Sequence, residues 1–313
     1  MTRARLLPGI CRRDNAHSPA GFSLVELLVA SSLALIVMAS LATLFATFGR
    51  TVSQTQTVVD LNARIRIAAA QLRQDLYGIT APAKPWVRPE ANAGYFEVVE
   101  GVGTDSTPAG TLGDVDDRLM GTTTTFGKPF AGSVEGPSGI ETLESSCAEV
   151  VWFCEPSGQT FEGKPLYNLY RRQLLVSATP GAAWFASSVS AAVDRNLTDL
   201  SVRDAGTSKT ANSLSDLSKP ANRFWAVSGA TKTLQGSRLG EDIILPNVIA
   251  FDVRTYSIPA SAYTDQSFNT NYVENAAPTT GDPLRGVEVR IRCVESSTKQ
   301  IRQATVVHSF EGL

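Results

Sequence analysis

The chain opens with a long apolar stretch and continues into a hydrophobic pattern of helical period. Residues 27–48 carry no charge, proline or glycine. A helix of about 22 residues spans about 33 Å, which matches the roughly 30 Å hydrocarbon core of a membrane. Apolar residues then recur three and four positions apart in residues 51–77, as on a helix that packs against a globular core. These apolar positions are Val58, Leu61, Ile65, Ala68, Leu72 and Leu76.

We therefore expect one long helix over residues 22–77. Its first part, residues 22–48, is predicted to lie in a membrane or a filament core, and residues 49–77 form an amphipathic half. A coiled-coil anchor is the alternative for the second half. The alanines of the stripe and its lack of ordered charge pairs favour packing on a sheet instead.

After a Pro-rich connection at residues 81–93, the pattern changes to the period of two that is typical of strands. Strands are predicted at residues 95–100, 118–120, 122–126, 149–154, 166–177, 287–293 and 301–310, with one more after Pro246. Residues 178–240 are poor in strongly apolar side chains and are predicted to form long surface loops, with a little helix at 194–200. The predicted fold class is α+β: a long N-terminal helix packed on a mainly antiparallel sheet, with residues 78–313 as a β-rich external head domain.

Composition narrows the range of functions. The 313 residues contain 28 Lys and Arg against 30 Asp and Glu, so the chain has no basic field for nucleic acid and no nucleic-acid partner is expected. The two histidines, His17 and His308, are too few for a multi-histidine metal site. No glycine-rich phosphate loop, zinc-ligand spacing or nucleophile elbow occurs. We predict a protein that is not an enzyme and has no cofactor and no metal.

Charge around the apolar stretch predicts its orientation in a membrane. Four basic residues precede it, and Asp14 is the only acid among the first 21 positions. The positive-inside rule therefore places the N-terminus in the cytoplasm and the remaining chain outside. A secretory signal peptide fits poorly because its apolar region is shorter, about 7 to 15 residues. The basic residues are Arg3, Arg5, Arg12 and Arg13.

Glu26 lies directly before the uncharged stretch. An ionisable side chain at that depth is costly unless it has a partner, so it marks a functional position. If the chain were cut between Gly21 and Phe22, the new α-amino group would lie four residues before Glu26 and could supply the cation.

These residues carry a family resemblance. The string Gly21-Phe22-Ser23-Leu24-Val25-Glu26-Leu27-Leu28 resembles the class III signal of type IV prepilins and type II secretion pseudopilins. The resemblance implies that a prepilin peptidase, which is also an N-methyltransferase, removes residues 1–21 as a leader. Gly21 is then the cleavage-site residue, Phe22 the methylated N-terminus and Glu26 the assembly carboxylate. The leader departs from many in the family by its length and by its lack of a basic residue at positions 15–20.

The order of elements carries a weaker resemblance. A strand, an irregular insertion and a final hairpin resemble the larger minor subunits, the J-type pseudopilins and the W-type minor pilins. This implies a minor pilin or pseudopilin of a type IV pilus or type II secretion pseudopilus. The large size of the mature chain and the presence of Glu26 favour a place near the tip, beneath another subunit. Its partners would be other minor pilins or pseudopilins and the filament assembly platform. It would be stored in the inner membrane as a single-pass protein. A membrane-anchored external enzyme or binding protein is the alternative, and the sequence leaves pilus, secretion and DNA uptake open.

Cysteine spacing provides a geometric test. Cys11 lies in the leader, so the mature chain retains Cys147, Cys154 and Cys293. A strand between Cys147 and Cys154 would separate their α-carbons by about 20 Å, well beyond the limit of about 7 Å for a disulfide. We expect free buried thiols, with a bridge between Cys154 and Cys293 as the alternative.

One acidic cluster, Asp114, Asp116 and Asp117, has the right chemistry for calcium. An EF-hand loop would need glycine and glutamate where the chain has Leu119 and Thr125. The cluster is therefore predicted to be a solvated turn.

Overall fold

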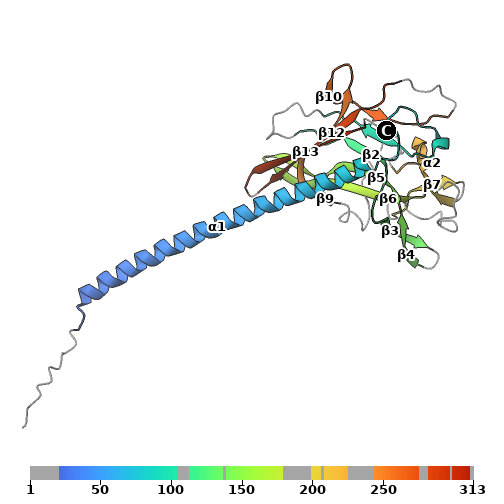
Figure 1. Ribbon diagram of the computed structural model, residues 1–313. Helices are drawn as coiled ribbons and strands as arrows, with labels where there is room; N and C mark the ends of the chain where they lie inside the picture. The colour runs from blue at the N-terminus through green and yellow to red at the C-terminus, as the bar shows by residue number, and fades with distance from the viewer. Residues whose placement is uncertain are drawn as a thin grey trace, which may run out of the picture. The chain divides into compact units, whose positions relative to one another are not determined.

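The long N-terminal helix predicted from the sequence is confirmed. The computed structural model describes residues 21–103, 113–136, 139–178, 199–205, 208–224, 243–274, 281–296 and 298–310, so leader residues 1–20 lie outside the described part. Helix α1 (Leu24–Tyr77) is continuous, and Gly49 does not interrupt it (Figure 1). A single glycine costs a helix only about 1 kcal/mol relative to alanine. The chain forms two compact units, Met1–Thr55 and Gln56–Leu313.

The second unit is built on an antiparallel sheet. Nine strands of the described chain form it, in the order β11-β1-β2-β5-β6-β9-β12-β13, and β10 pairs with β9. The pairings between these strands are antiparallel, as the α+β prediction requires. The strands are β1 (Phe96–Val99), β2 (Arg118–Thr124), β5 (Cys147–Phe161), β6 (Lys164–Val176), β9 (Ile243–Ser257), β10 (Ala262–Thr264), β11 (Phe268–Asn269), β12 (Gly286–Glu295) and β13 (Gln300–Ser309).

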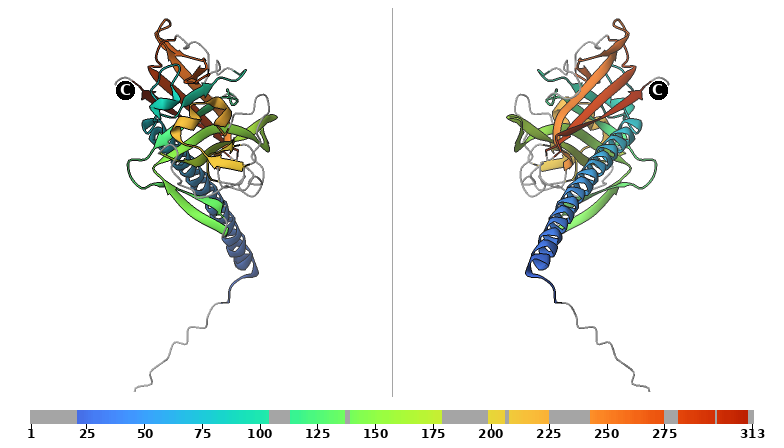
Figure 2. Two further views of the ribbon diagram at one scale, coloured as in Figure 1. Left: turned by 90° about the vertical axis from the view of Figure 1, so that its right-hand side faces the viewer. Right: turned by 90° about the vertical axis from the view of Figure 1, so that its left-hand side faces the viewer.

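Other elements pack on parts of both faces of this sheet, and alternate residues of its strands point to opposite sides. On one face, Leu72 of α1 packs in a core with Trp152 of β5 and Phe251 of β9. On the other face, Phe153 of β5 packs with Leu217 of the short helix α2 (Leu214–Leu217). Figure 2 shows the strands near the C-terminus beside the end of α1. The helix stripe predicted from the sequence therefore packs on the sheet.

Small elements complete the second unit. Two hairpins, β3–β4 and β7–β8, form separate two-stranded sheets. Neither hairpin was predicted from the sequence. The additional elements are β3 (Phe130–Gly136), β4 (Gly139–Ser145), β7 (Val202–Ala205), β8 (Ser208–Ala211) and the 3-10 helices η1 (Pro89–Ala91) and η2 (Pro220–Asn222).

The expectation of surface loops at residues 178–240 was wrong for the described residues 199–205 and 208–222. Leu200 is buried and bridges to Leu175 of β6, and Leu217 is buried in the sheet core. Of the helix predicted at residues 194–200, only Asp199 and Leu200 are described, and neither is helical. A few apolar residues among many small ones are enough to attach this segment to the sheet.

Two strand predictions also need correction. The two short strands predicted at 118–120 and 122–126 are one strand, β2, which continues through Gly121. The strand predicted after Pro246 begins before it, at Ile243. Pairing with β6 shifts register around this proline, and Asn247 has φ 56°. Such an irregularity tolerates proline because a bulged position leaves no ladder hydrogen bond for its missing N–H.

One edge of β9 is paired by three successive partners. Its first part pairs with β6 and its last residues pair with β10. Between the β6 and β10 pairings, the segment before β2 makes backbone hydrogen bonds to this edge of β9, as a neighbouring strand would. Gly113 N donates to Ile249 O at 2.9 Å, and Phe251 N donates to Asp114 O at 2.6 Å. The opposite edge of β9 pairs with β12. Gly113 and Asp114 are therefore fixed on the sheet by backbone hydrogen bonds.

Candidate functional site

The predicted processing residues lie at the start of α1. Gly21 and Phe22 precede the helix, and Glu26 lies in its first turn. The first intrahelical bond runs from Leu27 N to Ser23 O, at 3.0 Å. No atom lies within 4 Å of a Cβ placed on Gly21, and Phe22 is 81% exposed. The bond between Gly21 and Phe22 is therefore accessible, as a peptidase substrate must be.

The following part of α1 is apolar and has no cover from the described chain. An 18-residue window of α1 has a mean hydropathy of 2.3 and no buried residue, so α1 is long and apolar enough to cross a membrane once. Its hydroxyl groups donate to carbonyls one turn earlier, as Ser40 does to Ile36 O at 2.8 Å and Thr47 does to Thr43 O at 2.8 Å. Satisfying these donors within the helix lowers the cost of placing them in an apolar medium.

The C-terminal end of α1 is attached to the sheet by a buried ion pair that sequence reasoning missed. Asp75 accepts two hydrogen bonds from Arg171, from Nε at 2.7 Å and from Nη2 at 2.8 Å. Trp152 Nε1 also donates to the Asp75 carboxylate, at 2.8 Å. Thr123 Oγ1 donates to the Asp75 backbone carbonyl, at 2.9 Å. An aspartate beside the apolar stripe of a helix was the only signal in the sequence.

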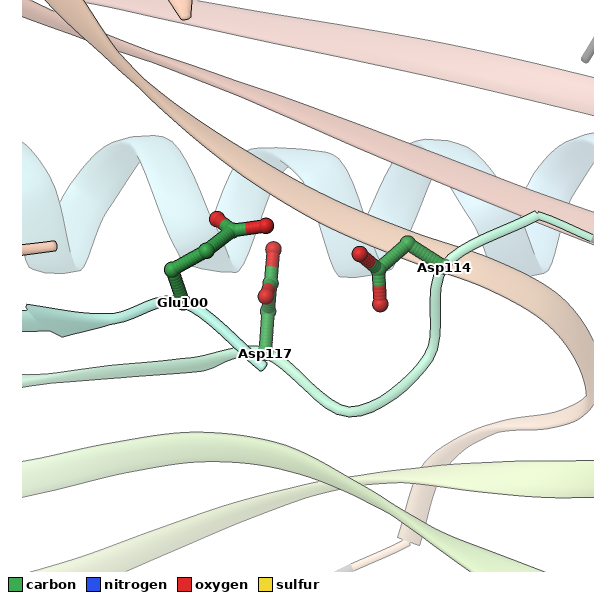
Figure 3. Close-up of side chains that lie close together, drawn as sticks. All are labelled: Glu100, Asp114 and Asp117. Carbon is green, nitrogen blue, oxygen red and sulfur yellow. The ribbon is translucent and has the colours of Figure 1, made fainter. Parts of the chain in front are cut away.

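The prediction of a solvated turn was wrong for two of the three aspartates, Asp114 and Asp117, whereas Asp116 is exposed. Asp114 and Asp117 are 2% and 0% exposed. Together with Glu100, which follows β1, they place one carboxylate oxygen each within 4.8 Å of one another (Figure 3). Glu100 was missed because it lies 14 residues or more from the two aspartates in the sequence and meets them only when β1 pairs with β2.

Backbone amides orient two of these side chains. Asp117 Oδ1 accepts from Gly101 N at 2.9 Å, and its Oδ2 accepts from Val253 N of β9 at 2.7 Å. Asp114 Oδ1 accepts from Asp116 N at 3.1 Å. Backbone amides thus fix the carboxylates of Asp114 and Asp117 beside the edge of β9.

The electrostatics of the cluster disfavour three negative charges. Burial, followed by the negative charge of Asp117, raises the pKa of Glu100 to about 8. Burial also raises the pKa of Asp117 to about 6, against the effect of its two backbone hydrogen bonds. The pKa of Asp114 lies well above its usual range, first because of burial and then because of the neighbouring carboxyl groups. Asp116 differs: its pKa is lowered, with hydrogen bonds from Asp114 and from Val102 N and Gly103 N outweighing burial.

The three cysteines of the described chain are free thiols, in agreement with the first of the two expectations. Cys147 and Cys293 are buried and Cys154 is partly buried. Cys147 and Cys154 both lie in β5, where the extended backbone keeps them apart. Burial raises the pKa of Cys154 and of Cys293, the latter to about 12. His308 packs against Phe310, with ring centroids 4.7 Å apart.

The fold defines the class of protein: an α+β protein with one long N-terminal helix. The first part of this helix is apolar and uncovered, and its last part packs on an antiparallel sheet. Comparison with known families is more specific. Residues 17–42 match the prokaryotic N-terminal methylation motif. The chain carries the prepilin-type cleavage and methylation signature of type IV pilins and pseudopilins. No curated protein and no solved structure matches the chain. Gly21, Phe22 and Glu26 lie within the matched residues, and their individual roles stay predictions.

Proposed function

We propose that the chain is a minor pilin or pseudopilin, a non-enzymatic structural subunit of a type IV pilus or a type II secretion pseudopilus. The observation that carries the proposal is the methylation motif at residues 17–42 at the start of the 54-residue helix α1. A motif that prepares an N-terminus for filament assembly is meaningful only before a helix that can leave a membrane and enter a filament core. The uncovered apolar part of α1 meets that requirement.

The proposed sequence of events begins in the inner membrane. The prepilin peptidase cuts after Gly21 on the cytoplasmic side and methylates the new amino group of Phe22. The apolar part of α1 then slides from lipid into the core of a growing filament, helped by the assembly platform. Glu26 pairs there with the Phe22 ammonium group of a neighbouring subunit, because an unpaired charge in an apolar core is costly. The domain around the sheet stays outside the membrane.

Substitution of Glu26 tests this mechanism. We expect Glu26→Ala to be processed normally but to be absent from sheared filaments, since only pairing in the filament core is lost. Phe22→Ala should reduce methylation more than assembly. Asp60→Ala is a matched control because Asp60 is an exposed acid on the same helix, and it should enter filaments at the wild-type level. Recovery of Glu26→Ala in filaments at the wild-type level would contradict the pairing mechanism.

Mass spectrometry of the mature N-terminus separates this proposal from a membrane-anchored enzyme or binding protein. With a co-expressed prepilin peptidase, the expected N-terminus is a methylated Phe22. An anchored protein of another class would keep an N-terminus at or near Met1, and its mass would not change when the peptidase is present.

A position near the tip is the finer part of the proposal. A wide external domain of this size is difficult to repeat at every small rise of a filament, and Glu26 gives the subunit a carboxylate for a neighbour above it. We expect immunogold labelling at filament ends in few copies, beneath one further subunit. Uniform labelling along the shaft would identify a major subunit instead.

A further inference from the structure

The buried carboxylates at the β9 edge lack the partners that burial requires. Both carboxylate oxygens of Glu100 and Oδ2 of Asp114 are buried, and none of them has a hydrogen-bond partner. Asp114 is itself only 2% exposed, and its carboxylate faces the other two side chains of the cluster (Figure 3). Buried polar atoms are almost always paired, so unpaired acceptors that converge on one point indicate an absent positive partner.

Protein cations do not supply this partner among the described residues. The charged groups that act most on Glu100 are themselves carboxylates: Asp117, Asp265, Asp252 and Asp116. Arg254, on β9, forms ion pairs with two other carboxylates, Asp252 at 3.1 Å and Asp265 at 2.8 Å. The cluster therefore concentrates negative charge that a bound cation would neutralise.

We propose that Glu100, Asp114 and Asp117 bind one Ca²⁺ ion. Three convergent carboxylates are a hard oxygen ligand set, which suits Ca²⁺ or Mg²⁺ rather than a softer transition metal. The three oxygens lie within 4.8 Å of one another. Two oxygens on one ion are separated by at most twice the metal–oxygen distance, which is about 5 Å for Ca²⁺, so the three oxygens can share one Ca²⁺ ion. Mg²⁺ keeps several of its waters, whereas these carboxylate oxygens are buried, so the site favours Ca²⁺.

The turn beside the cluster is closed by Asp116 and requires a glycine at position 101. A Cβ on Gly101 would lie 2.1 Å from the Asp116 carboxyl carbon, so only glycine fits beside that side chain. The Asp116 carboxylate accepts a hydrogen bond from Val102 N at 2.8 Å, which links the segment after β1 to the segment before β2. It is therefore a structural residue of the turn, and the ion would be held by its three neighbours.

Binding would attach the two ends of the β1–β2 connection to each other and to β9. Glu100 follows β1, Asp114 and Asp117 precede β2, and both aspartates are already bonded to β9 through Phe251 N and Val253 N. The ion would thus act as a structural staple between sequence-distant parts of the sheet. This role does not depend on filament assembly, so the site and the proposed function can fail separately.

Calorimetric titration of the full chain in detergent micelles, after treatment with a chelator, tests the site. We expect saturable binding of one Ca²⁺ per chain and weaker binding of Mg²⁺. At 100 times the dissociation constant, Ca²⁺ should raise the unfolding midpoint by at least about 5 °C. Absence of saturable Ca²⁺ binding up to about 10 mM free ion would overturn the proposal, since even weak protein sites bind Ca²⁺ below this range. Equal affinity for Mg²⁺ would overturn the assignment to Ca²⁺.

Isosteric variants identify the ligands. Asp114→Asn keeps the acceptor for Asp116 N but removes the charge, and we expect its Ca²⁺ affinity to fall at least tenfold. The Ca²⁺ affinity of Glu100→Gln should fall by the same factor. Without metal, Asp114→Asn should unfold at or above the wild-type temperature because one buried like charge is gone. A residue with only a structural role would not show this dependence on metal.

Glu162→Gln is the matched control, because Glu162 is an exposed carboxylate with a 63% exposed side chain. Its Ca²⁺ affinity should equal that of the wild type. Wild-type affinity in both Asp114→Asn and Glu100→Gln, or an equal loss in the control, would show that the ion binds elsewhere.

Discussion

Loss of the Asp75 charge should detach the end of α1 from the sheet. The side chains of Arg171 and Asp75 are 9% and 4% exposed, so the pair is largely removed from water. Asp75→Asn retains an oxygen for Trp152 Nε1 but leaves the guanidinium group of Arg171 without its anion. Removing one partner of a buried pair costs about 3 to 5 kcal/mol. Because asparagine retains part of the hydrogen bonding, we expect the lower end, about 3 kcal/mol.

Equilibrium urea unfolding in detergent micelles, followed by circular dichroism, measures this loss. A loss of about 3 kcal/mol corresponds to a midpoint decrease of about 6 to 12 °C on heating for a domain of this size. Asp60→Asn, an exposed position on the same helix, should change stability by less than about 0.5 kcal/mol.

A double variant separates the pair from its surroundings. In the double variant Asp75→Asn/Arg171→Gln, the loss in free energy of unfolding should be smaller than the sum of the two single losses. We expect the difference to be at least about 1 kcal/mol. A stability of Asp75→Asn within about 0.5 kcal/mol of the wild type would refute the reasoning, because it would mean that the buried cation needs no anion.

Two further predictions concern the backbone and the thiols. Gly94 has φ 73°, and a Cβ there would lie 2.0 Å from Thr122 Oγ1, so Gly94→Ala should cost at least about 2 kcal/mol in urea unfolding. A Cβ on Gly127 would have no neighbouring atom within 4 Å, so the stability of Gly127→Ala should stay near that of the wild type. An equal loss of stability in Gly94→Ala and Gly127→Ala would contradict the steric account. Because burial raises the pKa of Cys154 and of Cys293, iodoacetamide at pH 8 should modify these thiols slowly in the folded chain and rapidly after unfolding. Fast labelling of the folded chain, measured by mass spectrometry, would contradict their burial.

The sequence predicted best those elements whose pattern is local and periodic. The stripe from Leu61 to Leu76 indicated which face of α1 packs on the sheet, and the core contains that face. The alternation in residues 287–293 indicated β12, which has the same alternation of buried and partly buried positions over much of its length. Both follow from a fixed repeat of side-chain direction along one element, so no distant residue is needed to predict them.

What the sequence could not show depends on residues distant along the chain. Asp114 and Asp117 resemble ordinary turn residues, yet backbone groups of β9, more than 100 positions later, bury and orient them. Asp75 gave little signal because its partner, Arg171, is 96 residues away. The β9 strand was shortened in the prediction because Pro246 normally ends a strand, and only the register shift against β6 explains how it is accommodated.

The two parts of α1 differ in what covers them, and this difference constrains the surroundings of the chain. The sheet buries Leu61 and Leu76, whereas large apolar side chains earlier in the helix, such as Leu35 and Phe45, are 67% and 70% exposed. Leaving such a side chain in water costs about 1.5 to 3 kcal/mol, so a dozen of them would cost tens of kcal/mol. An apolar environment must cover this part of the helix.

Lipid alone meets only part of that requirement, because it gives Glu26 no partner. Another helix of the same kind, with a free amino group at Phe22, offers both an apolar surface and a cation near the depth of the carboxylate. The same residues that make the isolated helix costly in water therefore favour its assembly with copies of similar helices, which is why we propose that Glu26 acts in assembly rather than in anchoring.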